Sequence, residues 1–226
     1  MIRLFVTGSG TGVGKTLVTA ALTHQLRRAG KSVRAVKPVI SGYTPETHGD
    51  SDTACLLDSL GESHANAAVD RVSPFRFAAP LAPDMAAARE GKRLDFAALM
   101  RFCRASADGP EDILLIEGVG GVMVPLTEGE TVLDWIAALG TPSLVVAGSY
   151  LGTISHTLTA ADALRQRRLP IAGIVISESE ESPVPPEETR ATLRRFLPGI
   201  AIAIVPRLAG DAPWRSAPDL TALLPG

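Results

Sequence analysis

The sequence has few cysteines and no long apolar run. Only Cys55 and Cys103 occur among its 226 residues, and their spacing is not that of a metal site, so we expect two reduced, packed thiols. No apolar stretch approaches the ~18 residues that a membrane span needs, and the first residues lack the basic and apolar regions of a signal peptide. We therefore expect a cytoplasmic protein.

An excess of charge of one sign is also missing. The net charge is −2 at pH 7, so no basic field favours nucleic-acid binding. Hydrophobic residues make up 46% of the chain, which is long enough for one sizeable core. No internal repeat is evident, and we interpret the acidic, proline-rich stretch 177–188 as a surface loop. We therefore expect one domain that spans residues 1–226.

A glycine-rich stretch stands between the first apolar run and a helical pattern. Residues 8–16 are Gly-Ser-Gly-Thr-Gly-Val-Gly-Lys-Thr. This order is typical of a phosphate-binding P-loop, whose backbone N–H groups hold phosphate oxygens. Lys15 would reach the β- and γ-phosphates, and the Thr16 hydroxyl would bind Mg²⁺. The loop is one residue longer than G-x-x-x-x-G-K-[ST], and the alternative is a glycine turn that binds nothing.

Apolar runs, each followed by a loop and a helical pattern, recur along the chain. The runs are near-continuous, which is typical of strands buried on both faces. We expect strands at 2–6, 33–39, 113–116, 143–147, 171–176 and 200–205. We expect helices at 15–29, 51–60, 83–90, 96–107, 132–139, 154–168 and 187–196. This pattern predicts an α/β fold of P-loop NTPase type, with a doubly wound, mainly parallel sheet that binds ligands at the carboxyl ends of its strands.

Three charged residues near expected strands or helices are candidates for one site. We interpret Lys37 as a second cation for the phosphates, although an edge or snorkelling lysine is the alternative. Glu117 ends a strand before the glycines of 118–121, as a Walker-B acid does, and a solvated loop carboxylate is its alternative. Asp52 precedes a helical run, where it could serve as the N-cap, as a functional acid, or as both.

The segment from Gly152 to His156 follows a strand and begins a helix. A helix N-terminus after a glycine is an anion site, which could hold a carboxylate. The alternative is that Ser155 or Thr153 only caps the helix and that His156 is an ordinary surface residue. The residues alone leave both interpretations open.

Taken together, these segments resemble the dethiobiotin synthetase family. The matching pieces are Phe5-Val-Thr-Gly8, Gly12-Val-Gly-Lys-Thr16, Lys37-Pro-Val-Ile-Ser-Gly42, Asp50-Ser-Asp52, Glu117-Gly-Val-Gly-Gly121, Leu151-Gly-Thr-Ile-Ser-His156 and Ile204-Val-Pro206. They follow the family order and cover most of the chain, and the longer P-loop is usual in this family.

The resemblance implies a reaction in biotin synthesis. One amine of 7,8-diaminononanoate takes up CO₂ to form a carbamate, whose oxygen attacks the γ-phosphate of ATP. The second amine then closes the carbamic–phosphoric anhydride to the cyclic urea of dethiobiotin, and phosphate leaves. Mg²⁺ is the implied cofactor, and the implied assembly is a homodimer with its active sites at the interface.

The resemblance also implies a role for each matching residue. The metal ligands would be Thr16, Asp52 and Glu117, and the catalytic residues would be Lys37, Lys15 and Thr11. The substrate contacts would be Thr11 and Ser41, with Gly152, Thr153, Ile154 and Ser155 of one subunit reaching the substrate carboxylate held mainly by the other. The nucleotide contacts would be Gly12, Val13, Gly14, Lys15, Thr16, Leu17, Asp52, Glu117, Gly118, Val119, Gly120, Ser177, Pro206, Arg207 and Leu208.

The chain departs from the family pattern at three of these positions. Gly12 stands where many members have an acidic residue, and Ser155 stands where an asparagine is frequent. Near the position of Ser177, relatives commonly have an asparagine that reads the nucleotide base. A serine hydroxyl cannot make the paired hydrogen bonds of an amide with adenine, so other triphosphates compete with ATP as candidate co-substrates.

Three other functions are compatible with a P-loop. A partition-type switch ATPase would have a lysine where this chain has Gly10. An ATP-dependent amidoligase would need a glutaminase domain, for which this sequence has no cysteine context. A nucleotide-binding protein without turnover would have little use for Lys37 and Ser41 beside the P-loop. We therefore place the synthetase ahead of all three.

Overall fold

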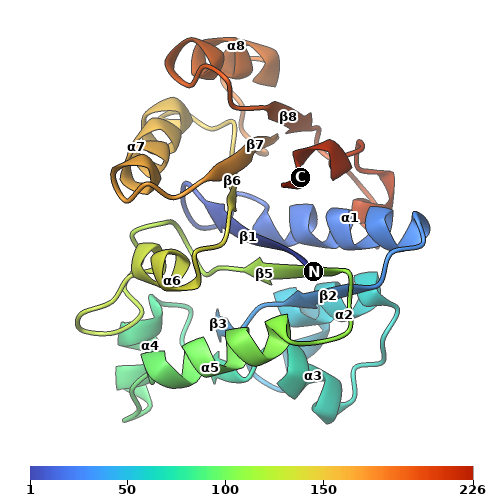
Figure 1. The fold of residues 1–226 in the computed structure, drawn as a ribbon, viewed down its shortest axis with the longest axis vertical. Coiled ribbons are helices and arrows are strands. Elements are labelled where there is room, and N and C mark those ends of the chain that lie inside the picture. The colour runs from blue at the N-terminus through green and yellow to red at the C-terminus, as the bar shows by residue number, and fades with distance from the viewer. Residues whose placement is uncertain (226) are drawn as a thin grey trace.

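Six parallel strands form the central sheet of this protein, in the order β2-β5-β1-β6-β7-β8 (Figure 1). They are β1 (Ile2–Gly8), β2 (Val33–Val36), β5 (Ile113–Glu117), β6 (Ser143–Ala147), β7 (Ile171–Ser177) and β8 (Ile202–Val205). All of their pairings are parallel, which confirms the predicted doubly wound sheet. The structure is a computed structural model that describes residues 1–225, and Gly226, the last residue of the expected domain, lies outside that range.

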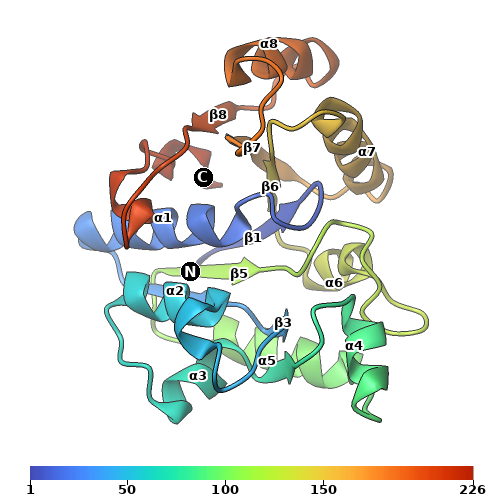
Figure 2. The same cartoon turned by 180° about the vertical axis from the view of Figure 1, so that it is seen from behind.

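Helices cover both faces of this sheet (Figures 1 and 2). One face carries α1 (Lys15–Arg28), α2 (Asp52–Leu60) and α3 (Asn66–Val72). The other carries α5 (Phe96–Ala107), α6 (Val132–Leu139), α7 (Thr153–Gln166) and α8 (Pro186–Phe196). A short helix, α4 (Pro83–Arg89), and three 3₁₀ turns at His48–Asp50, Pro213–Ser216 and Thr221–Leu223 complete the described elements. None of the helices in residues 1–225 has the length and apolar character that crossing a bilayer requires.

The strands are apolar throughout because alternate side chains enter two separate cores. In β1, Leu4 and Val6 pack on the α1 side, whereas Phe5 packs on the α5–α6 side, where its ring meets Trp135 edge-on at 4.8 Å between centroids. All four side chains are fully buried. Burial of each such side chain contributes about 1.5–3 kcal/mol to the stability of the fold. Both faces of the sheet therefore hold helices in place.

The expected strand 33–39 is wrong in one respect, because the chain leaves the sheet at its middle. Val33–Val36 forms the edge strand β2, and Val39–Ser41 forms β3, which pairs with β4 (Phe75–Phe77) in a separate two-stranded sheet. Pro38 has no N–H to give to a ladder, and the Lys37 N–H donates to the Val72 carbonyl at 3.0 Å. This break turns Lys37 off the sheet edge. The helix α3 and the strand β4 were not expected from the sequence.

The carboxyl ends of the parallel strands meet at one edge of the sheet. The P-loop follows β1 there, and Glu117 and Ser177 are the last residues of β5 and β7. Lys37 follows β2 directly. The candidate residues therefore reach one edge from segments far apart in the sequence, as the doubly wound arrangement predicts.

Candidate functional site

The P-loop ends in a helix whose first N–H groups have no side-chain cap. Gly14 is the N-cap of α1 and has a φ of 88°, a left-handed conformation that suits glycine. A Cβ at this position would lie 2.5 Å from Ser177 Oγ, so the turn also packs against the end of β7. Because no side chain occupies the helix N-terminus, its N–H groups remain free for an anion.

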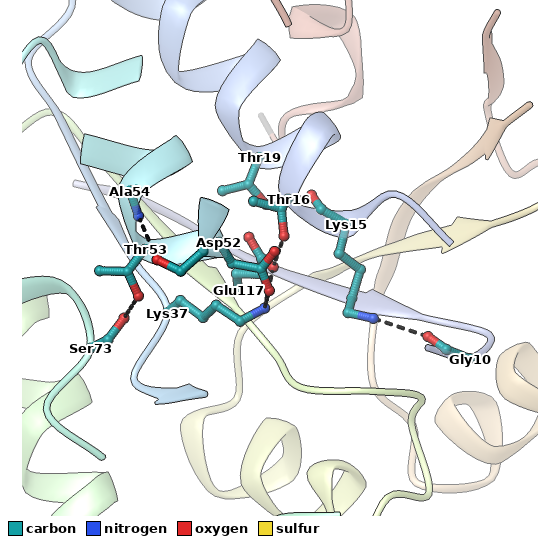
Figure 3. Close-up of polar contacts among 11 residues, drawn as sticks. Gly10, Lys15, Thr16, Thr19, Lys37, Asp52, Thr53, Ala54, Ser73 and Glu117 are labelled. Atoms are coloured by element: carbon teal, nitrogen blue, oxygen red, sulfur yellow. Dashed lines mark hydrogen bonds and ion pairs between the residues drawn. The ribbon is translucent and has the colours of Figure 1, made fainter. Parts of the chain in front are cut away.

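Lys15 is buried behind this loop and points back along it. Its Nζ donates to the Gly10 carbonyl at 3.0 Å, which Figure 3 shows. Burial, followed by the charge of Lys37, lowers the pKa of the Lys15 ammonium to about 8. A neutral carbonyl is its hydrogen-bond acceptor in this structure, so a phosphate would be a stronger partner than the one it has.

Lys37, Asp52 and Glu117 form a compact ionic cluster (Figure 3). Lys37 Nζ lies 2.6 Å from Asp52 Oδ2 and 2.6 Å from Glu117 Oε1. The Thr16 hydroxyl donates to the same Glu117 Oε1 at 2.6 Å. Glu117 is fully buried, and its Oε2 has no hydrogen-bond partner. The alternatives of a snorkelling lysine and a solvated loop carboxylate are therefore wrong.

The cluster shifts the pKa of its lysine and of its partly buried acid, Asp52, in opposite directions. Burial alone would lower the pKa of Lys37, but Glu117 and Asp52 outweigh it and raise this pKa above its usual value. Burial alone would raise the pKa of Asp52, but the adjacent Lys37 ammonium has a larger and opposite effect. The pKa of Asp52 is therefore lowered from its usual value. Both groups are thus held in their charged forms at neutral pH.

Asp52 is not the N-cap of α2, which the sequence had left open. Ser51 is the cap, and its hydroxyl accepts from the Ala54 N–H at 3.2 Å. Asp52 is the first helical residue, so its carboxylate is free to reach Lys37. Ser51 thus caps the helix, and its neighbour Asp52 pairs with Lys37.

A cavity of about 320 Å³ opens above this cluster. Its walls bring together most of the residues that the sequence singled out. They are Thr11, Gly12, Gly14, Lys15, Thr16, Lys37, Ile40, Ser41, Asp52, Val119 and Gly120. Ile40 was not expected, and its only signal was its place next to Ser41. The size and the two lysines suit a phosphorylated ligand rather than an apolar one.

Four other candidates support the cavity without lining it. Glu117 lies beneath it, in contact with Thr16 and Lys37. Val13 is buried in the core on the α1 side, and Leu17 packs against that core, so only their backbones could touch a ligand. A Cβ at Gly118 would lie 2.8 Å from the Phe5 ring, so this glycine is required for packing against β1.

The remaining candidates lie at the same edge but outside the cavity lining. Ser177 contacts Gly14, and the Arg207 N–H donates to Glu178 Oε2 at 2.9 Å, which places the segment 206–208 beside the end of β7. Beyond β6, the loops at 148–152 and 178–182 are tied by two reciprocal bonds, from Ser149 N to Ser179 Oγ and from Ser179 N to Ser149 Oγ, at 2.9 and 2.8 Å. No sequence pattern had indicated this link.

The start of α7 is an open helix N-terminus. Gly152 is its N-cap, with a φ of 96° and no side-chain cap bond. The Thr153 hydroxyl donates instead to the Gly148 carbonyl at 2.7 Å, and Ser155 is exposed, so neither residue caps the helix. His156 is exposed and its Nδ1 lies 2.9 Å from Tyr150 Oη. The four residues 152–155 form no part of the cavity of their own chain.

Comparison with known proteins gives consistent matches over most of the chain. The family described as "AAA domain" matches residues 2–213. The ATP-dependent dethiobiotin synthetase BioD of Acidiphilium cryptum is 50% identical over 198 residues, covering 87% of this chain and 89% of that protein. The protein of the same name from Caulobacter vibrioides is 48% identical over 221 residues, covering 97% and 99%.

A solved structure shows the same fold. The MinC:MinD cell division protein complex of Aquifex aeolicus matches with a TM-score of 0.54, covering 91% of this chain and 81% of the matched chain. Its sequence identity is 14%, so the likeness concerns the arrangement of strands and helices alone. It agrees with the P-loop NTPase fold that the alternation of strands and helices predicted.

Proposed function

The chain belongs to the dethiobiotin synthetase family, and from this premise we propose how its carboxyl-edge cavity carries out the ATP-dependent closure of the dethiobiotin ring in biotin biosynthesis. The observation that supports the mechanism most strongly is the convergence of Lys15, Lys37 and the pair Asp52–Glu117 on one cavity. Phosphoryl transfer needs positioning and charge neutralisation more than covalent help, and this cavity offers both.

A magnesium site at Thr16, Asp52 and Glu117 fits the donor atoms present. Glu117 Oε2 is buried without a partner, which is costly unless a cation or water takes it. No trio of His, Cys, Asp or Glu within residues 1–225 is arranged to hold a metal, so the Thr16 hydroxyl and substrate phosphates would have to complete the two-carboxylate set. When bound, Mg²⁺ would offset the negative charge of the phosphates.

The chain's own residues would act on the transferred phosphate. Lys15 and the N–H groups at the start of α1 would hold the β- and γ-phosphates. Lys37 would stabilise the charge that develops as a carbamate oxygen bonds to the γ-phosphorus and ADP leaves. Thr11 and Ser41, which both line the cavity, would orient the diamine and its carbamate. The second amine would then attack the carbamoyl carbon, and phosphate would leave with its oxygen as the amine loses a proton.

We propose a homodimer in which the open N-terminus of α7 binds the substrate carboxylate of the partner's site. Residues 152–155 offer uncapped N–H groups but lie outside the cavity of their own chain. The neighbouring Leu151 is 87% exposed and would be available for a contact between subunits. Ser155 leaves the carboxylate to backbone N–H groups.

The nucleotide base would lie along Ser177 and the segment 206–208. Ser177 adjoins Gly14 at the end of the P-loop, and the Arg207 N–H donates to Glu178, the residue after Ser177. The single hydroxyl of Ser177 would give weak discrimination between adenine and other bases, so we propose that CTP or GTP can replace ATP in part.

The test is phosphate release from MgATP and bicarbonate, with and without 7,8-diaminononanoate, with the product identified by mass. We expect release that depends on the diamine and yields the cyclic urea. Hydrolysis that ignores the diamine would reject this mechanism in favour of a switch ATPase, and binding without hydrolysis would favour a nucleotide-binding protein. The same assay with CTP and GTP in place of ATP tests the preference for the nucleotide base. Sedimentation at the assay concentration tests the homodimer, and a fully active monomer would contradict it.

A further inference from the structure

The Lys37 ammonium occupies the place between the two carboxylates that would bind the metal (Figure 3). Its Nζ is 2.6 Å from Asp52 Oδ2 and 2.6 Å from Glu117 Oε1. The same Glu117 Oε1 also accepts the Thr16 hydroxyl at 2.6 Å. Of the oxygens proposed for Mg²⁺, Asp52 Oδ2, Glu117 Oε1 and the Thr16 hydroxyl are therefore already engaged with one another or with a cation of the protein itself, and Glu117 Oε2 is left without a hydrogen-bond partner.

Burial makes this internal cation necessary in the free protein. Glu117 is fully buried and Lys37 is 4% exposed, so neither charge is well solvated by water. Without Lys37 the cluster would hold two neighbouring carboxylates that repel each other, with no ammonium in contact with them. Lys37 places an ammonium against both of these carboxylates.

Metal and lysine cannot share these oxygens in the observed arrangement. Mg²⁺ requires its oxygen ligands at about 2.0–2.1 Å in near-octahedral geometry and repels a neighbouring ammonium. A metal that takes Asp52 Oδ2 and Glu117 Oε1 must therefore displace Lys37 Nζ from both. Lys37 lines the cavity, so its displaced ammonium moves into the space where the phosphates would bind.

We propose that Lys37 is a built-in cation that excludes metal from the free protein and is exchanged for metal only when a nucleotide arrives with it. This inference rests on the proposed function in assigning Thr16, Asp52 and Glu117 to the metal. The exchange releases Lys37 toward the transferred phosphate at the moment when the metal replaces its charge on the carboxylates.

Binding of Mn²⁺ without nucleotide, followed by electron paramagnetic resonance, tests the exchange directly. We expect the free protein to bind Mn²⁺ weakly, and the Lys37→Met variant to bind one Mn²⁺ at least tenfold more tightly. Adding Glu117→Gln to that variant should remove the gained site. The matched control is Lys15→Met, which removes a neighbouring buried lysine but keeps Lys37 on the carboxylates, and should tighten Mn²⁺ binding less than threefold.

Equal Mn²⁺ affinity in the wild-type and Lys37→Met proteins would overturn the proposal. If Lys37→Met does not fold, ¹⁵N NMR of lysine ammonium groups in the wild type decides instead. In the free protein, the Lys37 ammonium protons should exchange slowly with water. The Lys37 signal should be unaffected by ADP with a chelator and should shift when MgADP is added. A signal that does not respond to MgADP would reject the replacement of Lys37 by metal. Neither measurement needs the diamine, so loss of diamine-dependent phosphate release would reject the proposed reaction and leave this result intact.

Discussion

Two buried lysines line one cavity, yet their surroundings differ. Lys37 has two carboxylate partners, which raise its pKa, whereas Lys15 has a carbonyl partner and a pKa lowered to about 8 by burial and by Lys37. Lys37 is thus bound to charged groups of the protein, and Lys15 gains its first anionic partner only when a ligand enters. We therefore propose that the P-loop lysine acts mainly in phosphate binding and Lys37 mainly in catalysis.

We predict that Lys37→Ala abolishes most turnover while nucleotide still binds. Loss of one group that stabilises the developing charge costs roughly 10²–10³ in rate, and the phosphates are held mainly by the P-loop. The measurement is diamine-dependent phosphate release together with ADP affinity by calorimetry. If loss of nucleotide binding is the main defect, then Lys37 acts mainly by holding the bound nucleotide, and its assigned role in stabilising the developing charge is wrong.

Gly14→Ala should destabilise the protein more than Gly12→Ala. Both glycines have positive φ, of 88° and 72°, which costs an alanine about 1–2 kcal/mol. A Cβ at Gly14 would also lie 2.5 Å from Ser177 Oγ, whereas one at Gly12 meets nothing within 4 Å. Urea unfolding should show a free-energy difference of at least about 1 kcal/mol between the variants. Equal losses would mean that the end of β7 moves aside without cost.

Residue types could be predicted at this scale, but their partners could not. A lysine and a glutamate at strand ends beside a P-loop were recognisable from position. The contact between Thr16 and Glu117 joins residues 101 positions apart, and local sequence contains no record of it. The division of roles between Ser51 and Asp52 depends on the backbone angles at the start of α2, and either residue satisfies the sequence preference for an N-cap.

Most of the elements were predicted, including the short helix α4, whereas α3 and β4 were not. The helix α3 has 7 residues and the strand β4 has 3, too few for a period to be distinguished. Both are held by neighbours: Phe75 N donates to the Pro38 carbonyl at 3.0 Å, and Ala68 and Val69 enter the core on the α1 side. Their formation depends on tertiary contacts that propensity does not contain.

The start of α6 offers a pH-dependent test. Thr131 and Asp134 form a capping box, and Arg167 Nη2 lies 2.8 Å from Asp134 Oδ1. The hydrogen bond from the Thr131 N–H lowers the pKa of Asp134, and this effect is larger than the opposite effect of burial. The Arg167 guanidinium lowers this pKa further. A carboxylate with a lowered folded-state pKa stabilises the protein above its unfolded pKa, and this contribution is lost as the pH falls through the folded value.

We therefore predict that Asp134→Asn costs about 1 kcal/mol at pH 7 and progressively less as the pH falls below about 4. Urea unfolding of both proteins across this range measures the difference. Arg167→Gln should cost less at pH 7, because the Thr131 N–H remains in place. A loss for Asp134→Asn that stays constant down to pH 3 would indicate packing rather than charge.

At the scale of the whole molecule, the two cores shield both thiols. Cys103 is fully buried in α5, and Cys55 is partly buried in α2. Burial raises the pKa of each thiol to about 12, so neither forms the reactive thiolate near neutral pH. We predict that the native protein reacts slowly with 5,5′-dithiobis(2-nitrobenzoate) at pH 8 and that both thiols react at once in urea. Rapid labelling of the native protein would show that the layer around α2 opens readily.

The fold class followed from the alternation of strands and helices, whereas the strand order did not. The near-continuous apolar runs indicated strands buried on both faces, and the two cores explain them. That β1 lies between β5 and β6 depends on pairing between segments more than 100 residues apart. No local pattern encodes which of several similar apolar runs becomes the neighbour.

The central position of β1 has a consequence for how this chain folds as it is made. β1 is paired on both sides by strands that end at Glu117 and Ala147, which are made after it. The P-loop sequence is therefore made early, but the backbone that positions it is not fixed until the chain through Ala147 has been made. During that interval an apolar strand has both edges open, which exposes the unfinished chain to pairing with other strands.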